Sequence, residues 1–227
     1  MPRPNRYWIE EGVYHLTVRG NNRQHIFVDD RDRREYLLML HQCRQRYPYQ
    51  LLAFCLMSNH VHLLIESSRE GLMSEAMQWF NASYTRYFNT QHQRVGHLYQ
   101  GRFFSNLVDR DPYLLEVTRY IHLNPFRARL VQQPLEYPWS SYRIYGGLEQ
   151  DPWQLVQPGR VLAFFGSSLA EQSQRYREFV DQIVDEKVTL EPWVRTLRRK
   201  GLIPSRRWLC EKASEKVSDT FPALKSV

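Results

Sequence analysis

The stretch from Leu51 to Ile65 restricts the possible folds more than any other part of this sequence. It opens with an uninterrupted apolar run, Leu51 to Met57, and continues into a second β-rich segment, Ser58 to Ile65. The apolar run is far shorter than the roughly 18 residues that a membrane-spanning helix needs. A short apolar run of this kind is typical of a buried strand. The sequence therefore predicts β-structure here, formed either by one bent strand or by two consecutive strands.

The other predicted elements alternate between strand and helix along the first 125 residues. Val13–Val18 and Phe103–Val108 have the β-rich composition of strands. Helices are predicted over 30–47, 72–88 and 111–124, the last with Asp111 as N-cap, Pro112 in its first turn and Pro125 as its end. Strands interleaved with helices in this order predict an α+β fold. Its antiparallel sheet should be of the split-βαβ type (ferredoxin/RRM-like), flanked by helices.

The composition of the chain changes near residue 145. All predicted strands precede that point, whereas a Pro- and Gly-containing stretch and then helical patterns follow it. We therefore expect one domain over residues 1–145 and a mainly helical, basic C-terminal extension over residues 146–227. Most of the net positive charge lies between Lys187 and Lys216. That segment could clamp a bound polyanion or cover its binding site.

Charge and aromatic content together indicate a nucleic-acid partner. The chain has 31 Lys and Arg residues against 24 Asp and Glu, a net charge of +7, and 14% of its residues are Phe, Trp or Tyr. Basic groups bind phosphates and aromatic rings stack on bases, a combination that suits single-stranded nucleic acid. The three cysteines, Cys43, Cys55 and Cys210, are too scattered for a disulfide framework or a zinc site. With no signal-peptide core at the N-terminus, we expect a cytoplasmic protein with no membrane partner and no small-molecule substrate.

His60 and His62 form the first candidate site. Side chains two residues apart on a strand point to the same face, so both imidazoles could bind one divalent metal, with a third ligand from elsewhere. In the helix predicted over 111–124, Tyr120 and Asn124 are four residues apart and lie above one another. An oxygen of Asn124 beside two histidine nitrogens would suit Mn²⁺ or Mg²⁺. The alternative is that Tyr120 is a core aromatic, Asn124 a C-cap and the histidine pair a chance occurrence.

Four motifs in order give these residues a family resemblance. The strings YHLTVRGNNRQHIF (14–27), LMSNHVHLLIE (56–66), GHLYQGRFFS (96–105) and RYIHLNPFRARLV (119–131) resemble the REP-associated tyrosine transposases, which are single-tyrosine HUH nucleases. The segment PWSSYR (138–143) extends the resemblance to about residue 145. The remaining third of the chain is less diagnostic.

The resemblance implies a role for each matching residue. His60 and His62 match the metal-binding histidines, Asn124 the position of a third ligand, and Tyr120 the nucleophile. The implied activity is that of a DNA transposase, a site-specific single-stranded DNA endonuclease and strand transferase that forms a 5′-phosphotyrosine intermediate with Mg²⁺ or Mn²⁺. The implied substrate is hairpin-forming extragenic repeat (REP) DNA, and the family branch favours a monomer over a dimer.

DNA contacts are predicted at two places. The polar residues of the turn after the first strand could hold phosphates or read base edges, and three arginines flank the catalytic elements. These candidates are Arg19, Asn21, Arg23, Gln24, Arg102, Arg127 and Arg129. Two other functions stay open: a non-catalytic RRM-like nucleic-acid-binding regulator, and a metal phosphoesterase that uses water instead of Tyr120.

Overall fold

One four-stranded antiparallel sheet forms the centre of the molecule. The computed structural model describes residues 8–68, 72–108 and 111–185. The strands are β1 (Val13–Arg19), β2 (Tyr49–Leu56), β3 (His60–Ser67) and β4 (Phe104–Val108), in the spatial order β2-β3-β1-β4. All three neighbouring pairs are antiparallel. The predicted α+β fold with a split-βαβ sheet is thus confirmed, and the stretch from Leu51 to Ile65 forms two consecutive strands.

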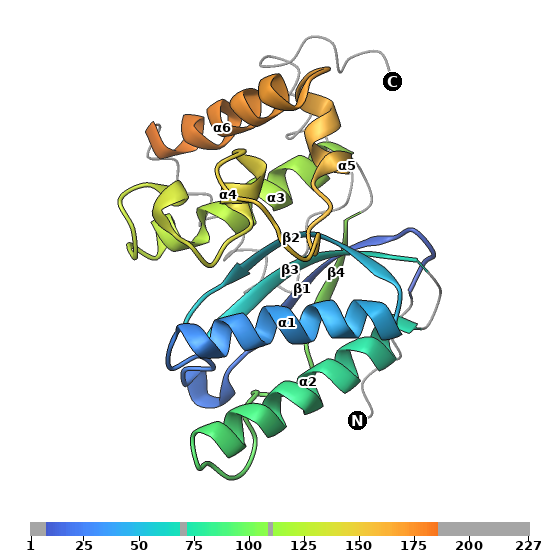
Figure 1. Ribbon diagram of the computed structural model, residues 1–227, viewed down its shortest axis with the longest axis vertical. Helices are drawn as coiled ribbons and strands as arrows, with labels where there is room; N and C mark the ends of the chain where they lie inside the picture. Colours follow the sequence, from blue (N-terminus) through green and yellow to red (C-terminus); the bar gives the residue numbers. More distant parts are fainter. Residues whose placement is uncertain (1–7, 69–71, 109–110, 186–227) are drawn as a thin grey trace, which may run out of the picture.

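Two long helices cover one face of this sheet (Figure 1). They are α1 (Asp30–Arg46) and α2 (Leu72–Gln91). α1 begins where expected, because the side chain of Asp29 accepts a hydrogen bond of 3.0 Å from the backbone N–H of Asp32. The apolar side of α1 then buries Tyr36 and Leu40 against the sheet.

The opposite face of the sheet carries the helices that follow β4 (Figure 1). α3 (Asp111–Arg127) lies next to the sheet and α6 (Leu169–Asp185) lies outside it. Arg119 joins these two helices, because its guanidinium donates to the carbonyl of Phe179 at 3.1 Å and lies 4.1 Å from the centre of the Phe179 ring. The shorter helices are η1 (Asn21–Arg23), η2 (Pro134–Glu136), α4 (Tyr142–Tyr145), α5 (Gly159–Leu162) and η3 (Ala163–Phe165).

The C-terminal end of α3 differs from the prediction. The helix continues through Pro125 to Arg127 instead of ending at Asn124. Proline removes one N–H donor, but the helix needs only one further half-turn, and the backbone N–H of Ala128 still bonds to the carbonyl of Asn124 at 2.9 Å. The side chain of Asn124 also donates to the carbonyl of Tyr120 at 2.8 Å, which adds a bond within this last turn.

The described part of the predicted extension packs against the sheet. The N–H of Gln157 donates to the carbonyl of Leu51 at 2.8 Å, beside an isolated parallel bridge between Leu51 and Val156. The division at residue 145 stays a prediction, and the basic segment from Lys187 to Lys216, with Cys210, lies outside the described residues. Cys43 and Cys55 are buried, free thiols.

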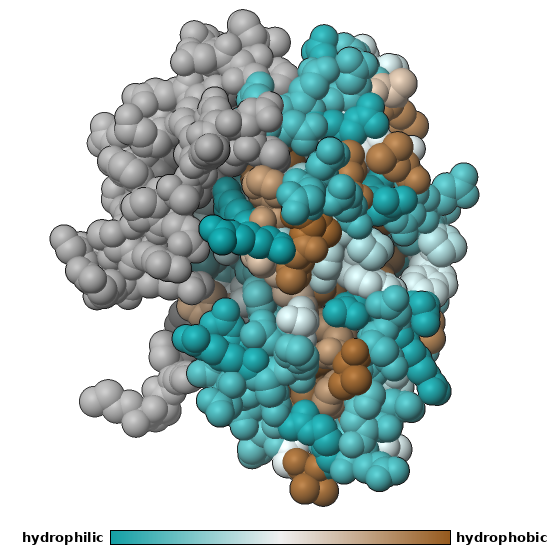
Figure 2. Space-filling model, turned by 90° about the vertical axis from the view of Figure 1, so that its left-hand side faces the viewer, coloured by the Kyte–Doolittle hydropathy of each residue, from teal (hydrophilic) through white to brown (hydrophobic). Residues whose placement is uncertain are grey.

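None of the helices in the described ranges combines the length and the apolarity that crossing a bilayer requires. Figure 2 shows mainly hydrophilic residues on the coloured part of one side of the molecule, with the hydrophobic residues in small separate groups.

Candidate functional site

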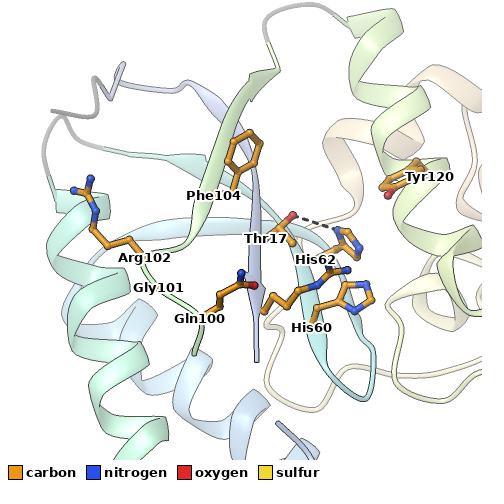
Figure 3. Close-up of a pocket in the computed structure, with 9 residues that line it drawn as sticks. Thr17, His60, His62, Gln100, Gly101, Arg102, Phe104 and Tyr120 are labelled. Atoms are coloured by element: carbon orange, nitrogen blue, oxygen red, sulfur yellow. Dashed lines mark hydrogen bonds between the residues drawn. The ribbon is translucent and has the colours of Figure 1, made fainter. Parts of the chain in front are cut away.

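The predicted histidines lie on the face of the sheet that α3 covers. β3 pairs with β1 so that His62 is opposite Thr17 and His60 is opposite Arg19. Because directly paired residues share a face of the sheet, these four side chains point to the same side. They belong to a pocket whose lining residues come from β1, β3, α3 and the chain entering β4 (Figure 3): Thr17, Arg19, His60, His62, Gln100, Gly101, Arg102, Phe104 and Tyr120.

Tyr120 reaches this pocket from α3. Its ring centre lies 5.6 Å from that of His62 and 6.1 Å from that of His15, with both rings edge-on to the tyrosine. The guanidinium of Arg127, two turns later on α3, lies 5.5 Å from the centre of the Tyr120 ring. The tyrosine is half-buried, so its ring is held in place while it still borders the pocket. Tyr113, which lies two turns earlier on α3, is not among the residues that line the pocket.

His15 belongs to this arrangement, although no role was predicted for it. Its Nε2 shares a hydrogen bond of 2.9 Å with Nδ1 of His62, and the two rings are stacked with centres 5.1 Å apart. Thr17 Oγ1 approaches the same Nδ1 at 3.5 Å. A hydrogen bond at Nδ1 fixes the orientation of the His62 ring, so Nε2 is the nitrogen through which it would bind the predicted metal. His15 follows the β1 alternation with Thr17 and Arg19, but only the register of β1 against β3 identifies its partner.

His60 is oriented by its sequence neighbour. The Nδ1 of His60 donates to the side-chain oxygen of Asn59 at 2.7 Å, and the Asn59 amide donates in turn to the carbonyl of Arg23 at 3.1 Å. Burial lowers the pKa of His60 from 6.5 to about 4, with a smaller contribution from the positive charge of Arg19. The imidazole is therefore neutral at pH 7, and its Nε2 keeps the lone pair that a metal ligand needs.

The donor set of the pocket suits the predicted metal in part. The rings of His60 and His62 have centres 5.0 Å apart and supply two imidazole nitrogens from one strand. Within the described ranges, no group of three or more His, Cys, Asp or Glu residues is arranged to hold a metal. Asn124 does not line the pocket, and its amide nitrogen bonds to the carbonyl of Tyr120. Two nitrogen ligands thus fit, and the Asn124 oxygen stays a predicted third ligand.

The arginines predicted to contact DNA are not all in one place. Arg19 and Arg102 line the pocket, and Arg127 lies over Tyr120. Arg129 is exposed just after α3, with a positive φ of 58°. The structure therefore places two of these arginines in the pocket lining and a third beside Tyr120, and DNA binding by any of them stays a prediction.

The polar turn after β1 serves the fold as well. Gln24 holds the loop that precedes β4, because its amide nitrogen donates to the carbonyl of Leu98 at 3.0 Å and its oxygen accepts from Arg94 at 2.6 Å. Asn21 and Arg23 lie in η1 with exposed side chains. The turn is thus fixed beside the pocket, whereas contact of these residues with DNA stays a prediction.

Comparison with known proteins now decides the family. The family described as IS200-like transposases matches residues 9–124, just over half of the chain. The chain belongs to the IS200-like transposase family. The matched region contains His15, His60, His62, Tyr120 and Asn124. The resemblance read from the four sequence motifs is confirmed.

Two individual comparisons agree with this assignment. A Haemophilus influenzae protein, provisionally named as a REP-associated tyrosine transposase, is 24% identical over 152 residues, which cover 63% of this chain and 86% of that protein. A solved structure of a REP-associated tyrosine transposase bound to a REP hairpin has a TM-score of 0.53 at 18% identity. The match covers 69% of this chain and 92% of the solved chain, so the two proteins share a fold.

A further histidine of the transposase, His122, lies on α3 only two residues after Tyr120 but faces away from the pocket. It is fully buried, with Nδ1 bonded to the Tyr176 hydroxyl at 2.7 Å and Nε2 bonded to the Ser141 hydroxyl at 2.8 Å. Burial lowers its pKa to about 3. Because both ring nitrogens are bonded inside the protein, His122 does not serve as a proton acceptor for Tyr120.

Proposed function

We propose that this IS200-like transposase cleaves and rejoins single-stranded DNA beside a hairpin, with Tyr120 as the nucleophile. The observation that carries the proposal is the shared pocket, in which Tyr120 from α3 faces His60 and His62 from β3. The hairpin bound by the solved REP-associated relative supports REP-type hairpin DNA as the substrate. The +7 net charge of the chain favours such a polyanionic partner.

The proposed cleavage step replaces the phosphodiester bond with a phosphotyrosine bond, so the energy of the broken bond is conserved. The Tyr120 hydroxyl oxygen attacks the scissile phosphorus, a P–O bond to tyrosine forms, and the P–O bond to the 3′ oxygen breaks. The net proton transfer is from the phenol to the departing 3′ oxygen. The products are a 5′-phosphotyrosine and a free 3′-OH, so a 3′-OH of the same or another strand can reverse the step and complete strand transfer.

His60, His62 and Asn124 are the proposed metal ligands. When bound there, Mg²⁺ or Mn²⁺ would polarise the scissile phosphate and stabilise its developing charge. The chain prepares the ligands beforehand, because Asn59 and His15 orient the two rings and burial keeps His60 neutral. Arg19 and Arg102 line the pocket and would bind neighbouring phosphates of the strand.

A monomer suffices for this reaction. Tyr120, His60 and His62 reach one pocket from a single chain, so no second copy is required to supply the nucleophile. This arrangement supports the monomer expected from the sequence. We propose that it acts in the cytoplasm, where replicating DNA exposes single strands.

A covalent-adduct assay tests the proposal. The protein is incubated with a 3′-labelled single-stranded REP hairpin oligonucleotide and Mn²⁺ or Mg²⁺, and the products are separated on denaturing gels. We expect a protein–DNA adduct that is lost in Tyr120→Phe, in His62→Ala and with a chelator. Tyr113→Phe, which changes the other tyrosine of α3, should retain the adduct.

Each alternative has its own outcome in this assay. Tight hairpin binding with no adduct and no cleavage would replace the proposal with the RRM-like regulator. Cleavage that persists in Tyr120→Phe would identify water as the nucleophile and make the protein a metal phosphoesterase.

A further inference from the structure

Phe104 is unusual for its exposure. Its side chain is 53% exposed, whereas every other Phe, Tyr or Trp side chain that the structure describes is buried or partly buried. The other exposed large apolar residues in the described ranges are aliphatic: Ile9, Val28, Val95, Leu130, Leu148 and Leu169. Single exposed aliphatic residues are common on soluble proteins and need no explanation. A solvent-exposed phenylalanine is of interest because of where it lies.

Phe104 stands at the edge of the candidate site. It is the first residue of β4 and pairs with Thr17 on β1, whose partner on the other side is His62 on β3. The three residues thus form one row across the sheet, and two inter-strand spacings separate the backbones of Phe104 and His62 by roughly 10 Å. The preceding residue, Phe103, points to the other face, where it is buried beside Trp8. Only Phe104 therefore faces the pocket.

The surroundings of Phe104 are polar and basic. Figure 3 shows its ring on β4 across the pocket from Tyr120, with Arg102 and Gln100 on the chain that leads into β4. Arg19 completes the basic part of the lining. An exposed ring beside arginines is the combination with which proteins bind single strands, because the ring stacks on a base while the cations hold the phosphates. β4 is also an edge strand of the sheet, with β1 as its one described neighbour.

We propose that Phe104 stacks on an unpaired base of the DNA strand, next to the phosphodiester that Tyr120 attacks. This inference rests on the proposed function for its ligand, single-stranded DNA. Stacking would position the strand without reading its sequence, because every base has a π-face. Phe104 is accordingly a substrate-positioning residue, and a planar aromatic side chain is the property that matters.

The test measures base stacking directly in a protein that cannot cleave. In the Tyr120→Phe background, the fluorescent adenine analogue 2-aminopurine is placed in turn at each unpaired position beside the hairpin. We expect its fluorescence to be quenched at one position on binding. Phe104→Leu should lose that quench and bind roughly 10-fold more weakly, whereas Phe104→Trp should restore both. Leu148→Ala, which removes another exposed apolar side chain, is the matched control and should change neither.

Salt dependence separates stacking from phosphate binding. Phe104→Leu should shift the affinity without changing the slope of log K against log salt, since no phosphate contact is lost. Equal quenching and affinity in Phe104→Leu would overturn the inference, as would wild-type binding without a quenched position. If the quench depends on Phe104 but the protein with Tyr120 intact forms no covalent adduct, the result would support stacking and reject the proposed cleavage.

Discussion

Two groups of histidine and tyrosine side chains lie on opposite sides of α3. The open group, His15, His60, His62 and Tyr120, contributes to the pocket or contacts its lining residues. The sealed group, His122, Tyr142, Tyr145 and Tyr176, is fully buried between α3, α4 and α6. Both groups contain closely packed rings, with centre-to-centre distances of about 5 to 6 Å.

The two groups differ in whether their polar side chains are enclosed by the protein or border the pocket. In the sealed group, both nitrogens of His122 are bonded to protein hydroxyls, and the Tyr145 hydroxyl donates to the carbonyl of Leu52 at 2.8 Å. In the open group, Asn59 bonds to Nδ1 of His60 and His15 bonds to Nδ1 of His62, and both of these histidines line the pocket. The same residue types are therefore sealed in the interior on one side of α3 and border the pocket on the other.

The largest expected effect distinguishes the two kinds of tyrosine. Tyr120→Phe should reduce adduct formation by more than about 10³-fold with little loss of stability, because it removes the nucleophilic oxygen alone. Tyr145→Phe should leave adduct formation per folded molecule unchanged but destabilise the protein by about 1–3 kcal/mol, because a buried carbonyl loses its donor. Gel assays and urea unfolding of both variants check the pair. A folded Tyr145→Phe protein without activity would contradict the comparison.

The next effect concerns the bond between His15 and His62. His15→Ala removes the group that orients the His62 ring, so we expect Mn²⁺ affinity to fall about 10- to 100-fold. Calorimetric titration with Mn²⁺ alone measures this without any DNA. His97→Ala, at an exposed histidine of the loop before β4, is the control and should bind like wild type. Unchanged affinity in His15→Ala would show that His62 needs no such support.

The sealed group should make the fold sensitive to acid. Burial lowers the pKa of His122 from 6.5 to about 3, so below pH 6.5 the unfolded chain binds a proton that the folded chain does not. Stability is fully present above pH 6.5 and is lost as the pH falls toward 3, by at most about 1.4 kcal/mol per pH unit. His60, with a pKa of about 4, acts in the same direction.

Urea midpoints at pH 7.5, 6.5 and 5.5 measure this dependence in the range above most carboxyl titrations. His122→Gln should flatten the profile over that range even if its stability at pH 7.5 is lower. His97→Gln, which removes an exposed histidine, should keep the wild-type profile. A wild-type slope in His122→Gln would assign the acid sensitivity to other groups.

The smallest expected effect concerns the arginines that line the pocket beside the open group. Arg102→Ala should weaken binding of the hairpin oligonucleotide a few-fold and lower the slope of log K against log salt by about 0.7, the value for one phosphate of a single strand. Arg175→Ala on α6, where the arginine pairs with Glu171 at 2.8 Å, should leave the slope unchanged. Fluorescence anisotropy at four salt concentrations would show either result.

The parts of the molecule that depend on local pattern were predictable. Predictions from neighbouring residues agree with the structure for the strand over Val13–Val18, for the start of α1 at Asp30 and for the spacing of His60 and His62 on one strand. The end of α3 was predicted wrongly, because a proline in the last turn costs only one hydrogen bond and the following residues still find partners. His15 was missed for a different reason, since its partner lies 47 residues away in the sequence.

The sequence by itself determined the alternation of strands and helices, the family motifs and the two histidines on one face of a strand, because periods of 2 and 3.6 residues are local properties of the backbone. Only the tertiary structure decided that β1 lies between β3 and β4, and hence that His15 supports His62 and that Phe104 faces the pocket. It also decided that Tyr120 borders the pocket while His122 is sealed away from it. These outcomes depend on strand order and helix packing, which arise from long-range burial of apolar surface and cannot be read from residues that are neighbours in the chain.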